Sequence, residues 1–126
     1  MLGFLGMFGR SRHLKVFEGR LHALDLHPRL VPDAVKLTVV KLVKEIHGED
    51  PSETALHRAA DLVAYCALGE TTFNDRNGDD LTSSLRHRLQ TALDDEDSLD
   101  AKLIMLTLYA NLIHPSLMST YGLRVE

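Results

Sequence analysis

The segment at residues 99–113 most constrains the fold, because as a helix it would be apolar on two sides. One face would carry Leu99, Leu103, Leu106, Ala110 and Ile113, and the other Ala101, Ile104, Met105, Leu108 and Leu112. A surface helix needs only one apolar stripe, so we expect neighbouring helices to cover this one on both sides. The segment therefore predicts an all-α, single-domain bundle of about five main helices around this central hydrophobic C-terminal helix.

Four further segments have apolar residues at helical spacing and recognisable ends. They cover residues 11–26, 32–48, 50–69 and 80–93, and one more short turn is expected at 116–121. Ser11 is a good N-cap, Pro32 suits a first helical turn, and a glycine ends the second and third segments. Residues 70–79 are expected to form a loop, because Asn77 and Gly78 make a strong turn signal. No segment shows the alternation of a strand.

Length and composition suit one globular domain. The chain has 126 residues, of which 44% are hydrophobic and 25% charged, enough for a single core. No run approaches the roughly 18 apolar residues of a membrane-spanning helix. Cys66 is the single cysteine, so no internal disulfide can form, which favours a reducing compartment. The apolar start has its charges after it, at Arg10 and Arg12, whereas a signal peptide has them before; we therefore expect a cytoplasmic protein.

Residues 1–10 combine large apolar side chains with glycine at positions 3, 6 and 9. Because each glycine disfavours a helix by about 1 kcal/mol, we expect a flexible apolar arm before a single helical domain at residues 11–126. The arm either packs on the core or on a neighbouring copy, or it docks on a partner groove or a membrane surface. Its short length and lack of tryptophan disfavour the membrane. The candidate interaction residues of the arm are Leu2, Phe4, Leu5 and Phe8.

Charge is distributed unevenly along the chain. Residues 1–47 contain 8 Lys/Arg and 4 Asp/Glu, a net charge of +4, whereas residues 48–126 contain 6 and 14, a net charge of −8. Either one half binds a partner, or the two halves attract each other. The total of −4 and the aromatic content of 6% argue against a nucleic-acid partner.

Two acid–histidine series at i, i+4 spacing could present metal ligands on one helix face. The better candidate is the series Glu53, His57 and Asp61. The other, Glu18 with His22, offers only two groups. A metal site in a helical bundle requires ligands that point inward from facing helices. The series at 53, 57 and 61 lies opposite the apolar face of its own helix, so we expect it to be solvated and expect no metal or other cofactor.

Residues of the types found in catalytic triads give no assembled active site. Asp80, Ser83, Ser84 and His87 would share one polar helix face, where nothing excludes water from a nucleophile. Cys66 lies among apolar positions, where cysteine usually behaves as an inert small hydrophobe. The sequence therefore does not favour an enzyme.

The predicted helix at residues 32–48 has a second apolar side, at Leu37 and Val40, beyond the face that it needs for the core. Together with the apolar arm and the two-sided C-terminal helix, this favours association with other protein surfaces. We expect a small non-enzymatic helical protein-interaction or regulatory module that self-associates as a homodimer or other homo-oligomer, or binds a protein partner.

The alternative is a sensor that binds a ligand or a metal between the C-terminal helix and the first or third predicted helix. Asp100, Thr107 and Asn111 would form a polar stripe along the C-terminal helix. This stripe is either the wet edge of the helix or the lining of a pocket, and buried polar groups in such a lining would have to be paired.

Overall fold

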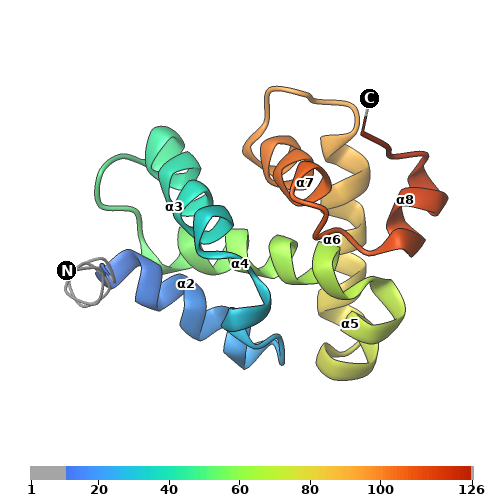
Figure 1. Ribbon diagram of the computed structural model, residues 1–126, viewed down its shortest axis with the longest axis horizontal. Coiled ribbons are helices and arrows are strands. Elements are labelled where there is room, and N and C mark those ends of the chain that lie inside the picture. Colours follow the sequence, from blue (N-terminus) through green and yellow to red (C-terminus); the bar gives the residue numbers. More distant parts are fainter. Residues whose placement is uncertain (1–10, 126) are drawn as a thin grey trace.

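Helices make up the regular structure of the part of the chain that is described, residues 11–125 of a computed structural model (Figure 1). In chain order they are α2 (Arg12–Ala23), the 3-10 helix η1 (Pro28–Leu30), α3 (Asp33–His47), α4 (Glu53–Leu68), α5 (Glu70–Asn77), α6 (Asp79–Ala92), α7 (Leu99–Tyr109) and α8 (Pro115–Tyr121). No strand occurs within residues 11–125. The all-α class is therefore confirmed, and α2, α3, α4, α6 and α7 correspond to the main helices that the sequence predicts.

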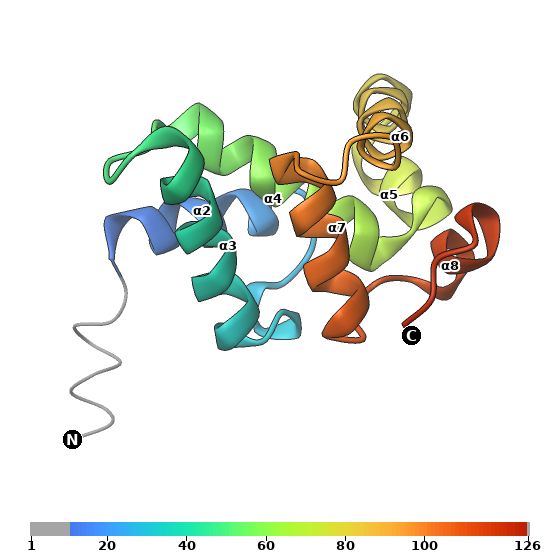
Figure 2. The ribbon, with the colours of Figure 1, turned by 90° about the horizontal axis from the view of Figure 1, so that it is seen from above.

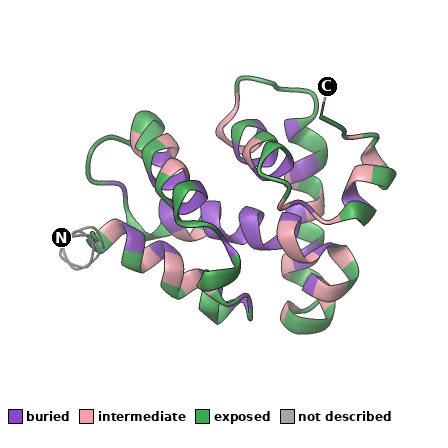
Figure 3. Ribbon diagram, viewed as in Figure 1, coloured by how far each residue is buried: buried purple, intermediate pink, exposed green. Residues whose placement is uncertain are grey.

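Helix α4 lies at the centre of the molecule. It packs against α2, α3, α5, α6 and α7, and two perpendicular views show these helices around it (Figures 1 and 2). Every residue from Ala59 to Cys66 is buried, so burial continues along α4 without the break that an exposed face would produce (Figure 3). Alanines at positions 55, 59, 60 and 64 allow neighbouring helices to approach closely. The other helices are therefore arranged around this buried stretch of α4.

Helix α7, which the sequence places at the centre, is covered on one side and exposed on another. Its buried residues are Ala101, Leu103, Ile104, Thr107 and Leu108. Met105 and Tyr109 are 51% and 57% exposed, so the expectation that neighbours cover Met105 on both sides is wrong for a single copy of the chain. The helix is also shorter than expected, because it ends at Tyr109 and Asn111 adopts a positive φ of 57°.

Serine side chains mark the starts of three helices. Ser11, Ser52 and Ser98 each accept a hydrogen bond of 3.1 Å from the backbone N–H three residues further on. Such an N-cap satisfies one of the N–H groups that a helix start leaves without a partner, and it typically contributes about 1 kcal/mol. Gly48 and Gly69 follow the ends of α3 and α4. The predicted bounds of α2, α3 and α4 differ from the observed ones by no more than 3 residues.

Residues 70–79, which the sequence predicts as a loop, form helix α5 instead. Phe73 is fully buried, and its ring lies edge-on to that of Tyr65 in α4, with 5.6 Å between the ring centroids. Gly69 and Gly78, with φ of 81° and 91°, are the single residues that separate α4, α5 and α6. The loop prediction is wrong because the turn signal at Gly78 marks a corner between two helices, and the burial of Phe73 holds the intervening segment against α4.

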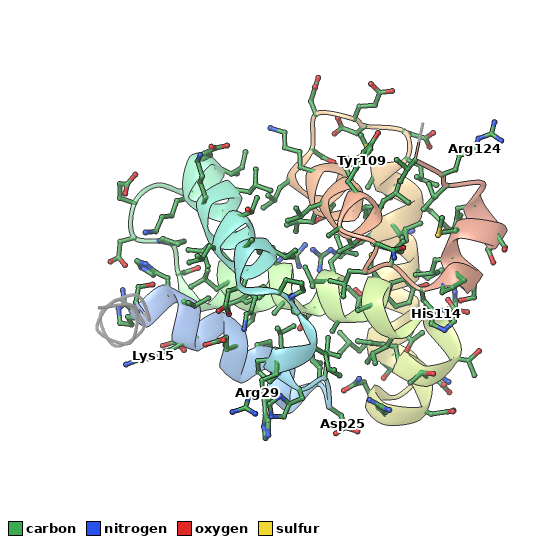
Figure 4. All side chains as sticks on the ribbon, in the orientation of Figure 1. Lys15, Asp25, Arg29, Tyr109, His114 and Arg124 are labelled. Atoms are coloured by element: carbon green, nitrogen blue, oxygen red, sulfur yellow. The ribbon has the colours of Figure 1, made fainter. Side chains whose placement is uncertain are left out.

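His114 holds the start of α8 against the corner between α4 and α5 (Figure 4). Its backbone N–H donates to the carbonyl oxygen of Cys66 at 2.8 Å. A Cβ atom at Gly69 would lie 2.8 Å from Cγ of His114, so the imidazole packs directly on this glycine. Nδ1 of His114 also accepts a hydrogen bond of 3.1 Å from the backbone N–H of Ser116, which caps α8. The short C-terminal turn that the sequence predicts is thus present as α8.

We expect Gly69→Ala to destabilise the fold more than Gly78→Ala, although the two glycines have nearly the same backbone conformation (φ 81°, ψ 163° and φ 91°, ψ 166°). Both substitutions put a Cβ where essentially only glycine is found, at a cost on the order of 1–3 kcal/mol. Only the change at Gly69 also crowds His114, because no described atom lies within 4 Å of a Cβ at Gly78. Overpacking adds about 1–3 kcal/mol. Urea denaturation measures both losses, and equal losses would contradict the packing of His114 on Gly69.

Candidate functional site

An apolar groove with a volume of about 450 Å³ runs beside α7. It is formed by the end of α6, the connection at residues 93–98, α7 and the segment after α8. Its lining residues are Ala92, Leu93, Glu96, Asp97, Ala101, Ile104, Met105, Leu108 and Leu123. The four that α7 contributes all belong to the second apolar face that the sequence predicts for this helix. That face therefore forms one side of an open groove.

Large apolar side chains are exposed in and next to this groove. Leu93 and Met105 line it and are 41% and 51% exposed. Tyr109, one turn further along α7, is 57% exposed, and Val125 is 53% exposed two residues after the groove residue Leu123 (Figure 4). Single exposed apolar residues are common on proteins, but several of them on adjoining elements indicate an interaction surface.

The polar residues that line the groove, Glu96 and Asp97, are both acidic. Asp94 and Asp95 precede them in the same connection, and all four are exposed. Arg124 follows the groove residue Leu123, but Figure 4 shows its side chain directed outward from the molecule. A partner that fills the groove would therefore fit best if it combined apolar side chains with basic ones.

The structure separates the two interaction residues predicted on α3. Leu37 is 52% exposed, whereas Val40 is only 6% exposed and belongs to the hydrophobic core. Because α3 packs against α2, α4 and α7, part of its second apolar side is used within the chain, and Val40 is corrected from a surface residue to a core residue. The interaction residues predicted on the arm lie outside the described residues: Leu2, Phe4, Leu5 and Phe8.

The candidate metal ligands are not brought together. Asp61 is 7% exposed, contrary to the expectation that it is solvated, and its Oδ1 accepts a hydrogen bond of 2.6 Å from Nε of Arg20. The reason is that α2 packs along α4 and places Arg20 against the side of α4 that looked polar in isolation. Glu53 is exposed at the start of the helix, and His57 is half-buried. Among residues 11–125, no group of three or more His, Cys, Asp or Glu side chains could hold a metal ion.

The predicted polar stripe on the C-terminal helix does not line a common pocket. Asp100 accepts hydrogen bonds of 3.0 Å and 2.8 Å from Nε and Nη2 of Arg88 in α6. Thr107 is fully buried and donates to the carbonyl oxygen of Ile104 at 2.7 Å. Asn111 is exposed beyond the end of α7. Each residue thus has a separate environment. Asp100 links α7 to α6, and Thr107 forms a hydrogen bond within α7.

A second polar cluster links α4, α5 and α6. Glu70 accepts hydrogen bonds of 2.8 Å from the hydroxyl of Tyr65 and 2.7 Å from Nε of Arg86. The hydrogen bond from Arg86 is the main cause that lowers the pKa of Glu70, whereas burial raises the pKa of the Tyr65 hydroxyl. A fully buried tyrosine that keeps its proton, beside a paired carboxylate, fits a structural role.

The residues of triad type on α6 are all exposed, as expected: Asp80, Ser83, Ser84 and His87.

A hollow of about 320 Å³ lies between α4 and α7, where the sequence places the alternative ligand site. Its lining also includes residues of α3 and α6, and the full set is Ile46, His47, Ala55, Arg58, Ala59, Arg88, Ser98, Leu99 and Asp100. The guanidinium of Arg88 already donates to Asp100 and, at 3.0 Å, to the carbonyl oxygen of Arg58. His47 and Arg58 are exposed at this hollow. The exposed basic groups of this hollow are thus His47 and Arg58, whereas Arg88 is already paired with Asp100.

Comparison of the chain with protein-family models, with curated proteins and with solved structures gives no match. None of the helices within residues 11–125 combines the length and the apolar character needed to cross a membrane.

We expect Arg20→Ala to destabilise the fold by about 2–3 kcal/mol, because it leaves the carboxylate of Asp61 buried without the guanidinium that pairs with it. Arg12→Ala is the matched control on the same helix, since Arg12 pairs with Asp50 at the surface, where both side chains are mostly exposed. Urea denaturation should show a much smaller loss for the control. Adding Asp61→Asn to Arg20→Ala should recover part of the stability, and a failure of Arg20→Ala to exceed the control would contradict the importance of this pair.

We expect the thiol of Cys66 to be unreactive toward disulfide reagents until the chain unfolds. Burial raises its pKa to about 12, with a partial opposing effect of the hydrogen bond with Thr107. A thiol of an unfolded chain ionises near pH 8.5, so the native state is favoured below this pH and loses that advantage as the pH rises toward 12. At pH 9.5 this thiol should lower the free energy of unfolding by about 1.4 kcal/mol relative to pH 7, and Cys66→Ala should remove that loss, as measured by urea denaturation. A thiol that reacts rapidly in the folded protein would contradict this burial.

Proposed function

We propose that this chain is a small non-enzymatic helical interaction module that associates with a second copy of itself. The observation that carries the proposal is the apolar groove beside α7, together with the exposed side chains of Leu93, Met105 and Tyr109. Each Å² of apolar surface removed from water contributes about 25 cal/mol, so a second protein surface placed here would be stabilised. A C2 dimer is the commonest arrangement of such homo-oligomers.

The way in which the buried polar groups are used supports a non-enzymatic role. Among the described residues, every buried side-chain nitrogen or oxygen has a hydrogen-bond partner. The charged pairs Arg20–Asp61 and Arg88–Asp100 join different helices, so these charges hold the fold together. Cys66 is buried with a raised pKa, which removes the thiolate that a nucleophile would need.

A cytoplasmic location and a protein partner are part of the same proposal. The single cysteine forms no internal disulfide and is compatible with a reducing compartment. The net charge of −4 and the acidic connection beside the groove disfavour nucleic acid as a partner. Contact with a membrane surface through the arm is the less favoured alternative, since the arm is short.

A ligand sensor is the second candidate function, and the hollow between α4 and α7 is the observation that favours it. Its volume of about 320 Å³ lies at the lower end of the range for small-molecule sites, roughly 300–1,000 Å³. A ligand that binds only the folded state must raise the apparent stability. Thermal denaturation with phosphate, citrate and divalent metals tests this candidate. A melting temperature that does not rise with any of them would count against it.

The interaction module predicts a molar mass that rises with concentration. Light scattering of the 126-residue chain should rise from 14.1 kDa toward twice that mass at micromolar concentrations. Met105→Glu should weaken association by about tenfold or more, because it puts a charge at the exposed edge of the groove. Leu30→Glu is the matched control, since Leu30 is 66% exposed on η1 and does not line the groove. A strict monomer at high micromolar concentration would overturn the proposal, and equal effects of the two variants would overturn the role of the groove.

A further inference from the structure

We propose that the occupant of the groove beside α7 is the segment at residues 1–10 of a second copy of the chain. This inference rests on the proposed self-association and names the part of the partner that enters the groove. The occupant must be apolar to cover the exposed groove residues Leu93 and Met105, and it must tolerate or pair with Glu96 and Asp97.

The sequence of this segment has both properties. Its apolar side chains are those of Met1, Leu2, Phe4, Leu5, Met7 and Phe8. Its charged side chain is that of Arg10, and it contains no acidic residue. Glycine at positions 3, 6 and 9 leaves room for close approach to another surface. Within this chain the groove residues thus have a partner sequence of matching polarity and opposite charge.

The lengths also match. Helix α7 lines the groove from Ala101 to Leu108, so the side of the groove that it forms is about 11 Å long at 1.5 Å per residue. An extended chain covers at most about 3.3–3.6 Å per residue, so three or four residues reach along the groove. The part of the segment from Phe4 to Phe8 is therefore long enough to fill the groove.

The position of α2 favours exchange between two copies. The first residue of α2, Arg12, pairs with Asp50 in the connection between α3 and α4. The groove is formed by α6, α7 and the segment after α8. Figures 1 and 2 both show the start of α2 and the C-terminal segment at opposite ends of the molecule. In a two-fold dimer each copy can give its segment to the other and receive one in return, which buries both grooves at once.

Disulfide trapping between distinguishable chains tests the inference. One chain carries Phe8→Cys, and an isotopically labelled chain of different mass carries Met105→Cys. Cys66 is fully buried, so it does not compete for oxidation. After mild oxidation of the mixture, mass spectrometry should find a disulfide between the two chains. Pairing of Phe8→Cys with Leu30→Cys, at an exposed site on η1, is the matched control and should give only background.

A chain that carries both Phe8→Cys and Met105→Cys separates exchange from binding within one copy. The inference expects covalent dimers from this chain, whereas a monomer with an internal disulfide shows that the segment fills its own groove and overturns the inference. In parallel, Phe4→Glu combined with Phe8→Glu should weaken dimerisation by about tenfold or more. The folded state is checked by circular dichroism.

The outcomes distinguish the inference from the proposed function. A wild-type chain that stays monomeric overturns both. A dimer that persists with Phe4→Glu and Phe8→Glu, and that gives no disulfide at Met105→Cys above the Leu30→Cys background, overturns the inference and leaves self-association standing. A dimer that is lost with Met105→Glu but not with the arm variant shows that another surface of the second copy fills the groove, and this also overturns the inference.

Discussion

The unbroken burial of α4 from Ala59 to Cys66 is the constraint on which the rest of the structure depends. Since all residues from Ala59 to Cys66 are buried, each side of this helix must face another part of the chain. Asp61 lies within this run, and a buried carboxylate is costly without a partner, so α2 must place Arg20 beside it. The contact of His114 with Gly69 then determines where the chain returns after α7. The positions of α2 and α8 are thus tied to one central helix.

The ends of the helices can be predicted from the sequence, whereas the identity of the central helix cannot. Ser11, Ser52 and Ser98 act within one turn of their own position, so their effect is visible in a local pattern. Burial depends instead on how many neighbours approach a helix. Helix α7 is the more apolar, but the alanines of α4 permit close approach on every side. The same reason explains why α5 was not predictable: Phe73 is buried beside the ring of Tyr65 in α4, a contact that the sequence of α5 alone does not show.

The residues of the candidate site are even harder to predict from the sequence than the central helix, because their environment is set by other helices. Asp61 and Asp100 are polar residues whose partners, Arg20 and Arg88, come from other helices, so their own helix gives no sign of burial or pairing. The groove likewise joins residues 93–98 to Leu123, and no sequence spacing relates these segments. The one signal that could have found it was the second apolar face of residues 99–113, which contains the four residues that α7 contributes to the groove.

That second face connects the sequence to the proposed association. Two apolar faces on one helix are expected to be covered, yet a single copy of the chain leaves Met105 51% exposed. A purely apolar partner would leave Glu96 and Asp97 uncompensated beside the interface, so the chemistry selects a partner that is both apolar and basic. Residues 1–47 carry a net charge of +4 and begin with an apolar segment, whereas the groove belongs to the half with a net charge of −8. Attraction between the halves, one of the two explanations for the charge asymmetry, already operates within a copy at Arg20 and Asp61. The start of α2 and the C-terminal segment lie at opposite ends of the molecule (Figures 1 and 2), so in the proposed dimer the arm of one copy would meet the groove of the other.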